Sequence, residues 1–290
     1  MPSSDRVHFP FASLFAIQLR TVGLAIAREG ALAVGALAAI CLLSSVTAIR
    51  FHERLDFMPE VLMPAFIVAA LLPWAVWKGD PAFGRAFLWT LPVRRQRAAI
   101  AKVASGALWL MLAMMAAFLI LVLMAVSTGG RVGIDEVRLV SGTRDLQAAV
   151  PVHWTTPLWM WLTPFGGALI LYMASSALLL GLRRPVRWIA GVAATFTLLI
   201  ALVVNFGPDS GVGHGFARLL GTLWGGKYGL DFAMSGGAAA LVEDVERPGG
   251  GSEGVWTALP TAGRWAAAYA VWLGGTLVAL ALALRRHWER

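Results

Sequence analysis

The sequence predicts an all-α polytopic membrane protein with six membrane-spanning helices. Of its 290 residues, 58% are hydrophobic and only 14% are charged, and the mean hydropathy is +0.71. Soluble domains carry about 25% charged residues on average, so this composition favours the membrane class. The single cysteine, Cys41, lies inside an apolar run and cannot form an internal disulfide.

Six apolar segments are long enough to cross about 30 Å of hydrocarbon as helices. Lipid offers no hydrogen-bond partners to the backbone, so a helix is the economical way for each segment to cross. The predicted spans are 30–49, 58–77, 103–126, 158–182, 186–206 and 265–284.

The segment before the first span, 9–27, has polar residues clustered on one side of a helix and apolar residues on the other. This pattern predicts a helix that lies in the membrane interface. The alternative is a cytoplasmic extension of the first span.

Charge predicts the orientation of the chain. The N-terminal segment, the loop between the second and third spans, the loop between the fourth and fifth, and the C-terminus hold 15 of the 24 lysines and arginines. By the positive-inside rule both termini are cytoplasmic. Arginines outnumber lysines 21 to 3, which favours a GC-rich bacterial genome and hence a bacterial cytoplasmic (inner) membrane. The net charge of +8 lies at span ends, which indicates contact with lipid headgroups and not with nucleic acid.

The last extracytoplasmic loop, 207–264, is much longer than usual. It contains two partly apolar pieces, 216–224 and 230–241, that are too short to span. We expect short re-entrant or interfacial helices there, before the sixth span.

The most informative segment is the loop from Lys78 to Lys102, which holds six cations and one acid. Asp80 suits an N-cap and Pro81 the first helical position, so a short helix is predicted over 80–90 and ends before Pro92. Its aromatic residues suit either of two roles: docking onto a partner, or lying flat among the lipid headgroups.

A family resemblance rests on this loop. The run 91–95 reads Leu-Pro-Val-Arg-Arg and is followed by Lys102 at the start of a span. This stretch resembles the membrane subunits of ABC transporters with a type-2 exporter permease fold. The resemblance implies that residues 1–290 form one transmembrane permease domain, in which the helix over 80–90 is a coupling helix. One departure is that Lys78, Gly79 and Asp80 stand where such proteins often have a glutamate.

The resemblance also implies partners and a function. The chain would pair with a second permease copy or a paralogue, and with ATP-binding-cassette ATPase subunits that hold ATP and Mg²⁺. The complex would export a hydrophobic or amphipathic substrate. The residues implied in docking the ATPase are Asp80, Phe83, Arg85, Phe87, Trp89, Arg94 and Arg95.

The chain itself is not predicted to be an enzyme. Its one match to G-x4-G-K, residues 221–227, is followed by Tyr228 where a phosphate loop needs Ser or Thr to bind Mg²⁺. The five histidines are scattered without ligand spacing, so no metal site is expected.

The predicted spans contain few charges, which argues against an ion-coupled secondary carrier. Milder polar residues at depth either serve helix packing or line a substrate path. The candidates for the path are Thr163, Tyr172, Ser176, Thr197 and Asn205. Two alternatives to an exporter stay open: a membrane scaffold or signalling subunit coupled to an ATPase, and an ion-coupled carrier. The identity of the substrate is also open.

Overall fold

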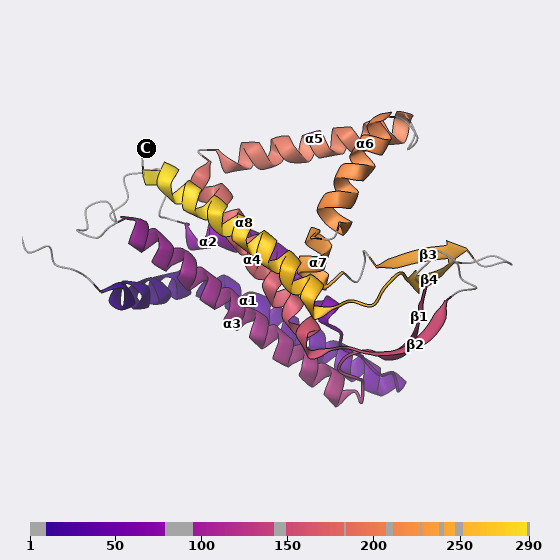
Figure 1. The fold of residues 1–290 in the computed structure, drawn as a ribbon. Coiled ribbons are helices and arrows are strands. Elements are labelled where there is room, and N and C mark those ends of the chain that lie inside the picture. The colour runs from indigo at the N-terminus through magenta and orange to yellow at the C-terminus, as the bar shows by residue number, and fades with distance from the viewer. Residues whose placement is uncertain are drawn as a thin grey trace, which may run out of the picture.

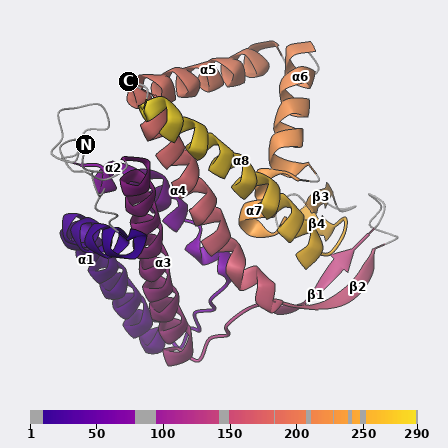
Figure 2. The same ribbon diagram turned by 60° about the vertical axis from the view of Figure 1, so that its left-hand side comes forward.

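The computed structural model describes residues 10–78, 95–141, 149–182, 184–206, 211–226, 228–237, 241–246 and 252–288. This part of the chain is mostly helical, and Figures 1 and 2 show its long helices gathered into a bundle with a small sheet beyond one end. Five stretches of helix are long and apolar enough to cross a membrane: Phe11–Phe51, Pro59–Val76, Gln96–Ser127, Leu158–Gly181 and Ala262–Arg285. The chain is therefore a multi-pass membrane protein in its architecture.

These five stretches coincide with five of the six predicted spans. They correspond to α1 (Phe11–Phe51), η1 (Pro59–Leu62) with α2 (Ala65–Val76), α3 (Arg95–Ser127), η4 (Leu158–Leu162) with α4 (Thr163–Gly181), and α8 (Ala262–Trp288). The remaining predicted span, 186–206, forms α5 (Pro185–Phe206). That α5 crosses the membrane stays a prediction.

Helix α1 joins the segment predicted to be interfacial to the first span without interruption. At 41 residues it is about 60 Å long, roughly twice the thickness of the hydrocarbon core. Figure 2 shows its indigo first part running at an angle to the rest. The indole of Trp109 on α3 donates a 3.0 Å hydrogen bond to the carbonyl of Leu19 and lies against Gly23. The first part of α1 is thus held against α3, and its position relative to a membrane stays a prediction.

The bundle has two main lines of packing, α1 along α3 and α4 along both α8 and α2. Gly166 of α4 lies beside Tyr269 of α8, and Gly181 lies beside Ala283. Since both residue numbers increase together, α4 and α8 run in the same direction. The main core lies between α2, α3, α4 and α8, and Tyr172 is its largest fully buried side chain.

A four-stranded sheet stands beyond the end of the bundle where α4 and α8 begin (Figure 1). Its strands are β1 (Asp135–Val140), β2 (Val150–Thr155), β3 (Val242–Glu246) and β4 (Ser252–Trp256), in the order β2-β1-β4-β3. Strands β1 and β2 form one antiparallel hairpin, and β3 and β4 form another. The two hairpins meet where Val140 of β1 pairs with Trp256 of β4. This sheet was not predicted from the sequence.

Three short helical elements follow α5: α6 (Gly211–Leu220), a π-helical turn η5 (Gly221–Gly225) and α7 (Leu230–Ser235). The two pieces predicted as short helices, 216–224 and 230–241, are therefore partly helical, and their re-entrant character stays a prediction. Helix α7 packs on α4 and α8. Helices α5 and α6 instead lead away from the bundle and back, and in Figure 2 they form a triangle with α8.

Candidate functional site

The loop that carries the proposed docking residues lies outside the described residues. This applies to Asp80, Phe83, Arg85, Phe87, Trp89 and Arg94, whereas Arg95 is the first residue of α3. The helix predicted over 80–90 is therefore neither confirmed nor contradicted.

Both ends of this loop are tied to neighbouring helices. At the first end, the ammonium of Lys78 lies 3.7 Å from a carboxylate oxygen of Glu29 on α1. At the second, Lys102 is 8% exposed and its ammonium lies 4.6 Å from the ring centroid of Trp77. The surface ion pair contributes little, but the cation–π contact is desolvated and stronger. The Lys102 contact thus joins the first turns of α3 to the end of α2, and the Lys78 pair adds a weak surface contact with α1.

Below the loop, α2, α3 and α4 form a closely packed base. A Cβ atom on Gly106 of α3 would meet the hydroxyl of Tyr172 on α4 and would lie 3.0 Å from Val76 on α2. The hydroxyl of Ser175 donates a 2.6 Å hydrogen bond to the carbonyl of Ala70, which joins α4 to α2. These contacts pack α2, α3 and α4 closely against one another.

The residues predicted to line a substrate path do not meet in one place. Thr163, Tyr172 and Ser176 are buried in the helix packing. The Thr163 hydroxyl donates to the Met160 carbonyl at 2.8 Å, and Ser176 is fully buried one helical turn after Tyr172. Thr197 is exposed on α5, and the side chain of Asn205 is not described. Whether any of them contacts a substrate stays a prediction.

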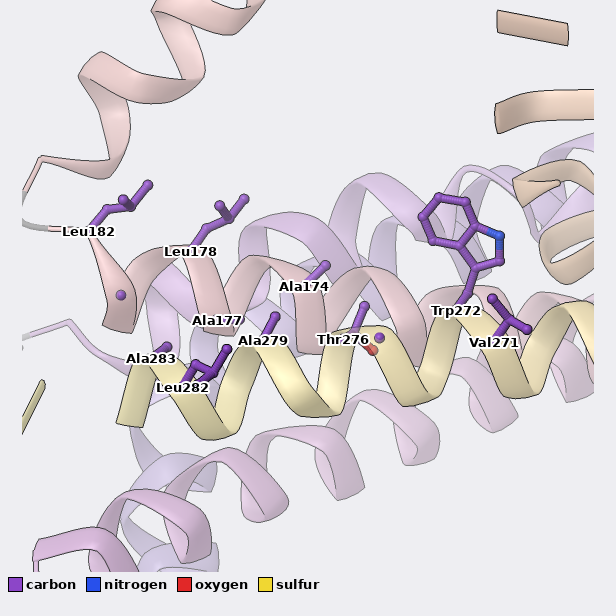
Figure 3. Close-up of a pocket in the computed structure, with 12 residues that line it drawn as sticks. Ala174, Ala177, Leu178, Leu182, Val271, Trp272, Thr276, Ala279, Leu282 and Ala283 are labelled. Atoms are coloured by element: carbon purple, nitrogen blue, oxygen red, sulfur yellow. The ribbon is translucent and has the colours of Figure 1, made fainter. Parts of the chain in front are cut away.

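A groove of about 670 Å³ opens between α4 and α8 instead (Figure 3). Its floor is made of small residues, so the two backbones are close to the surface. A Cβ atom added at Gly275 would meet nothing within 4 Å, which shows that no other described side chain fills this place. The hydroxyl of Thr276 donates to the carbonyl of Leu273 at 2.9 Å, so the groove offers an almost wholly apolar surface. Its lining includes Ala174, Ala177, Gly181, Gly275, Ala279 and Ala283.

This groove was not predicted, although the sequence contains a signal for it. Gly275, Ala279 and Ala283 are spaced by four residues, as are Ala177 and Gly181. Small residues at this spacing form flat faces that allow close helix contacts in membranes.

A buried carboxylate was also not predicted. Asp231 is 3% exposed at the start of α7, between α4 and α8. The hydroxyl of Ser235 donates to its carboxylate at 2.7 Å and accepts a 3.3 Å bond from the amide of Gly237. Because Asp231 lies in a segment predicted to be an extracytoplasmic loop, it was not counted among charges at depth.

On the sheet, Arg138 of β1 is the central polar contact. Its guanidinium lies 4.1 Å from the ring centroid of Trp256 on β4 and 5.6 Å from that of Trp154 on β2. Its Nε donates to Glu136 at 2.8 Å. Arg138 therefore joins the two hairpins to one another.

Within the described residues, no three histidine, cysteine, aspartate or glutamate side chains lie close enough together to hold a metal ion. No known protein family, no curated protein and no solved structure matches this chain. The function has therefore to be argued from the residues themselves.

Proposed function

We propose that this chain is the membrane-spanning subunit of an ATP-powered exporter of the ABC class, driven by a separate ATPase subunit. The chain would act as a pair, with a second copy or a paralogue. It would use the basic loop between α2 and α3 to receive the motion of the ATPase.

The observation that carries the proposal is the basic loop between α2 and α3, together with the contacts on its two sides. A loop with six cations between two apolar helices belongs on the cytoplasmic side by the positive-inside rule, where ATP is available. On the two sides of the loop, Lys102 of α3 packs on Trp77 at the end of α2, and Lys78 pairs with Glu29 of α1. A coupling element needs such a rigid base, because a displacement at a loosely attached loop would not reach the helices.

The groove between α4 and α8 supports an apolar or amphipathic cargo. It lies on two helices long and apolar enough to span a membrane, is lined by alanine, glycine, leucine and valine with one tryptophan and one threonine, and has the volume of a small-molecule site. A strongly polar cargo would lose its hydration there without gaining hydrogen bonds.

The buried Asp231 favours one alternative, an ion-coupled carrier. Ionisable groups buried among membrane helices often lie on ion or proton pathways. Asp231 lies one helical turn before Ser235 and accepts a hydrogen bond from its hydroxyl. ATP-independent transport that collapses with the ion gradient would support this alternative.

The proposed function is tested by purifying the full chain after co-expression with the proteins encoded beside its gene. We expect an ATPase to co-purify in a fixed ratio and to hydrolyse ATP. The double variant Arg85→Glu/Phe87→Ala should lose this ATPase, because it reverses a charge and removes a ring on the docking surface. The matched control is Arg131→Glu/Phe51→Ala, which makes the same changes at two exposed positions, one at the end of α1 and one in the segment after α3.

The proposal is rejected if the chain purifies alone although its neighbours are expressed. It is also rejected if both double variants retain the ATPase equally. If the ATPase binds and hydrolyses ATP but no cargo is moved, the scaffold alternative is favoured.

A further inference from the structure

Helix α5 and the groove between α4 and α8 have complementary surfaces that do not touch in this structure. In Figures 1 and 2, α5 leaves the bundle at its first residues and stands away from α8. At Gly275 no described side chain fills the groove. The floor of the groove and one face of α5 are made of small residues, which are the residues that membrane helices use for close contact.

The complementary surface on α5 is a stripe of four small residues. Ala190, Ala194, Thr197 and Ala201 are separated by four, three and four positions, so they share one face of the helix. All four are exposed. The opposite face carries larger residues, among them Trp188, which is 62% exposed.

Both ends of the α5–α6 arm are attached at the two ends of the groove. At one end only residues 182–184 separate α4 from α5, and Leu182 itself lines the groove. At the other end the indole of Trp272, which also lines the groove, donates a 2.9 Å hydrogen bond to the carbonyl of Tyr228 beyond α6 and η5. Helices joined by so short a connection usually pack side by side and antiparallel.

We propose that α5 is a lateral gate that closes onto the groove between α4 and α8. In the closed position its small-residue stripe lies in the groove, and in the position seen here the groove is open to the membrane. The inference does not depend on the ABC assignment, since it concerns only the packing of this chain.

The register of the closed position follows from the connection. Counting outward from residue 183, the middle of the connection, Ala190 comes level with Ser176 of α4, one residue from Ala177 in the groove lining. Because α4 and α8 run in parallel with Gly181 beside Ala283, Ala177 is level with Ala279. Ala190 and Ala279 should therefore face one another across the closed groove.

Disulfide cross-linking tests this position in the full chain, in native membranes. The background is Cys41→Ala, which removes the only cysteine. A disulfide forms readily only when the two Cα atoms are about 4.4–6.8 Å apart. We expect Ala190→Cys/Ala279→Cys to form a disulfide within one chain on mild oxidation, seen as loss of free thiols without a band of doubled mass. The control Gly191→Cys/Ala279→Cys places the thiol one residue on, about 100° around the helix, and should react severalfold less.

A third variant tests whether α5 packs in the groove itself. Gly275→Phe fits the open position, where a Cβ meets nothing, but fills the groove. Added to Ala190→Cys/Ala279→Cys, it should abolish the disulfide while leaving the gel-filtration profile unchanged. A disulfide that persists despite the Gly275→Phe substitution, equal reaction of the two cysteine pairs, or no reaction overturns the proposal. A disulfide between two chains also overturns it, because it would place α5 of a second copy in the groove.

Discussion

The hydroxyl of Tyr172 on α4 donates a 2.9 Å hydrogen bond to the backbone carbonyl of Val103 on α3. The phenol lies directly over Gly106, one turn further along the same helix, and Tyr172 is fully buried. The close contact of α3 with α4 therefore combines a glycine on α3, which leaves room for the phenol, with a hydroxyl on α4, which donates the hydrogen bond. This contact lies at the base of the basic loop.

Gly106→Ala should destabilise the protein, because the added methyl group would overlap the Tyr172 hydroxyl. Overpacking of this kind costs about 1–3 kcal/mol. Tyr172→Phe alone should cost about 1 kcal/mol, the value of one hydrogen bond. The double variant should cost less than the sum of the two, since removing the hydroxyl makes room for the methyl group.

The single cysteine provides the measurement. Cys41 is 5% exposed, so a thiol-reactive fluorophore labels it only as the protein unfolds on heating. Gly35→Ala is the matched control, because a Cβ at Gly35 meets nothing within 4 Å. Its melting temperature should be unchanged or slightly raised. Strict additivity of the Gly106 and Tyr172 effects would contradict the proposed contact.

The spans of this chain could be predicted from sequence because a membrane imposes a simple requirement. About 20 consecutive apolar residues are needed wherever a helix crosses, and five such predictions coincide with helices of sufficient length. The ends of the elements were less certain: the predicted interfacial segment and the first span are joined in the single helix α1, whose first part runs at an angle to the rest (Figure 2).

The sheet does not follow from this requirement, because it lies in the segments between spans, where no length of apolar sequence is needed. Its strands are short, and β1 and β4 touch only through residues more than 100 positions apart in sequence. The alternation of Val137, Leu139 and the rich β-branched content of β2 were the available signals.

The groove and Asp231 were missed for a different reason. Both depend on which helix faces which, and hydropathy does not contain that information. Asp231 reads as a loop residue until α7 is placed between α4 and α8. Conversely, Tyr172 and Ser176 read as polar groups at depth, and in the structure they are buried between helices.

Arg138→Ala should loosen the sheet without affecting the bundle. The guanidinium stacks on Trp256 and also contacts Trp154, and a partly buried cation–π contact contributes about 1–2 kcal/mol. Hydrogen exchange in β1 and β4 should become faster, while α3 and α4 keep their protection. Arg138→Lys should be intermediate, since an ammonium cannot stack in the same way. The control Arg131→Ala changes an exposed arginine near the sheet, and equal effects of the two alanine variants would refute the role of Arg138.

Asp231→Ala should lower the melting temperature more than Asp231→Asn. Asparagine keeps an oxygen that accepts the hydrogen bond from Ser235, whereas alanine removes it from a buried site. Removing a buried hydrogen-bond partner costs about 1–3 kcal/mol. The cysteine-labelling assay serves here too, with the exposed Glu53→Ala as control. If Asp231→Asn and Asp231→Ala are equally destabilised, the carboxylate acts through its charge and not through this bond.

The orientation of the chain is open to a direct test by fusion. Helices α2 and α4 run in the same direction, since Phe66 lies beside Gly167 and Ala70 beside Ser175. Helices α4 and α8 also run in the same direction, with Gly181 beside Ala283 near their ends. If the basic loop after α2 is cytoplasmic, the C-terminal end of α8 is therefore cytoplasmic too. A green fluorescent protein at the C-terminus should therefore fluoresce, and alkaline phosphatase fused after residue 141, at the end of β1, should be active. Changing Arg94, Arg95 and Arg97 together to glutamine should weaken this bias, since these cations hold the loop inside. An active phosphatase at the C-terminus combined with an inactive one at residue 141 would place the basic loop outside the cell, where no ATPase could reach it.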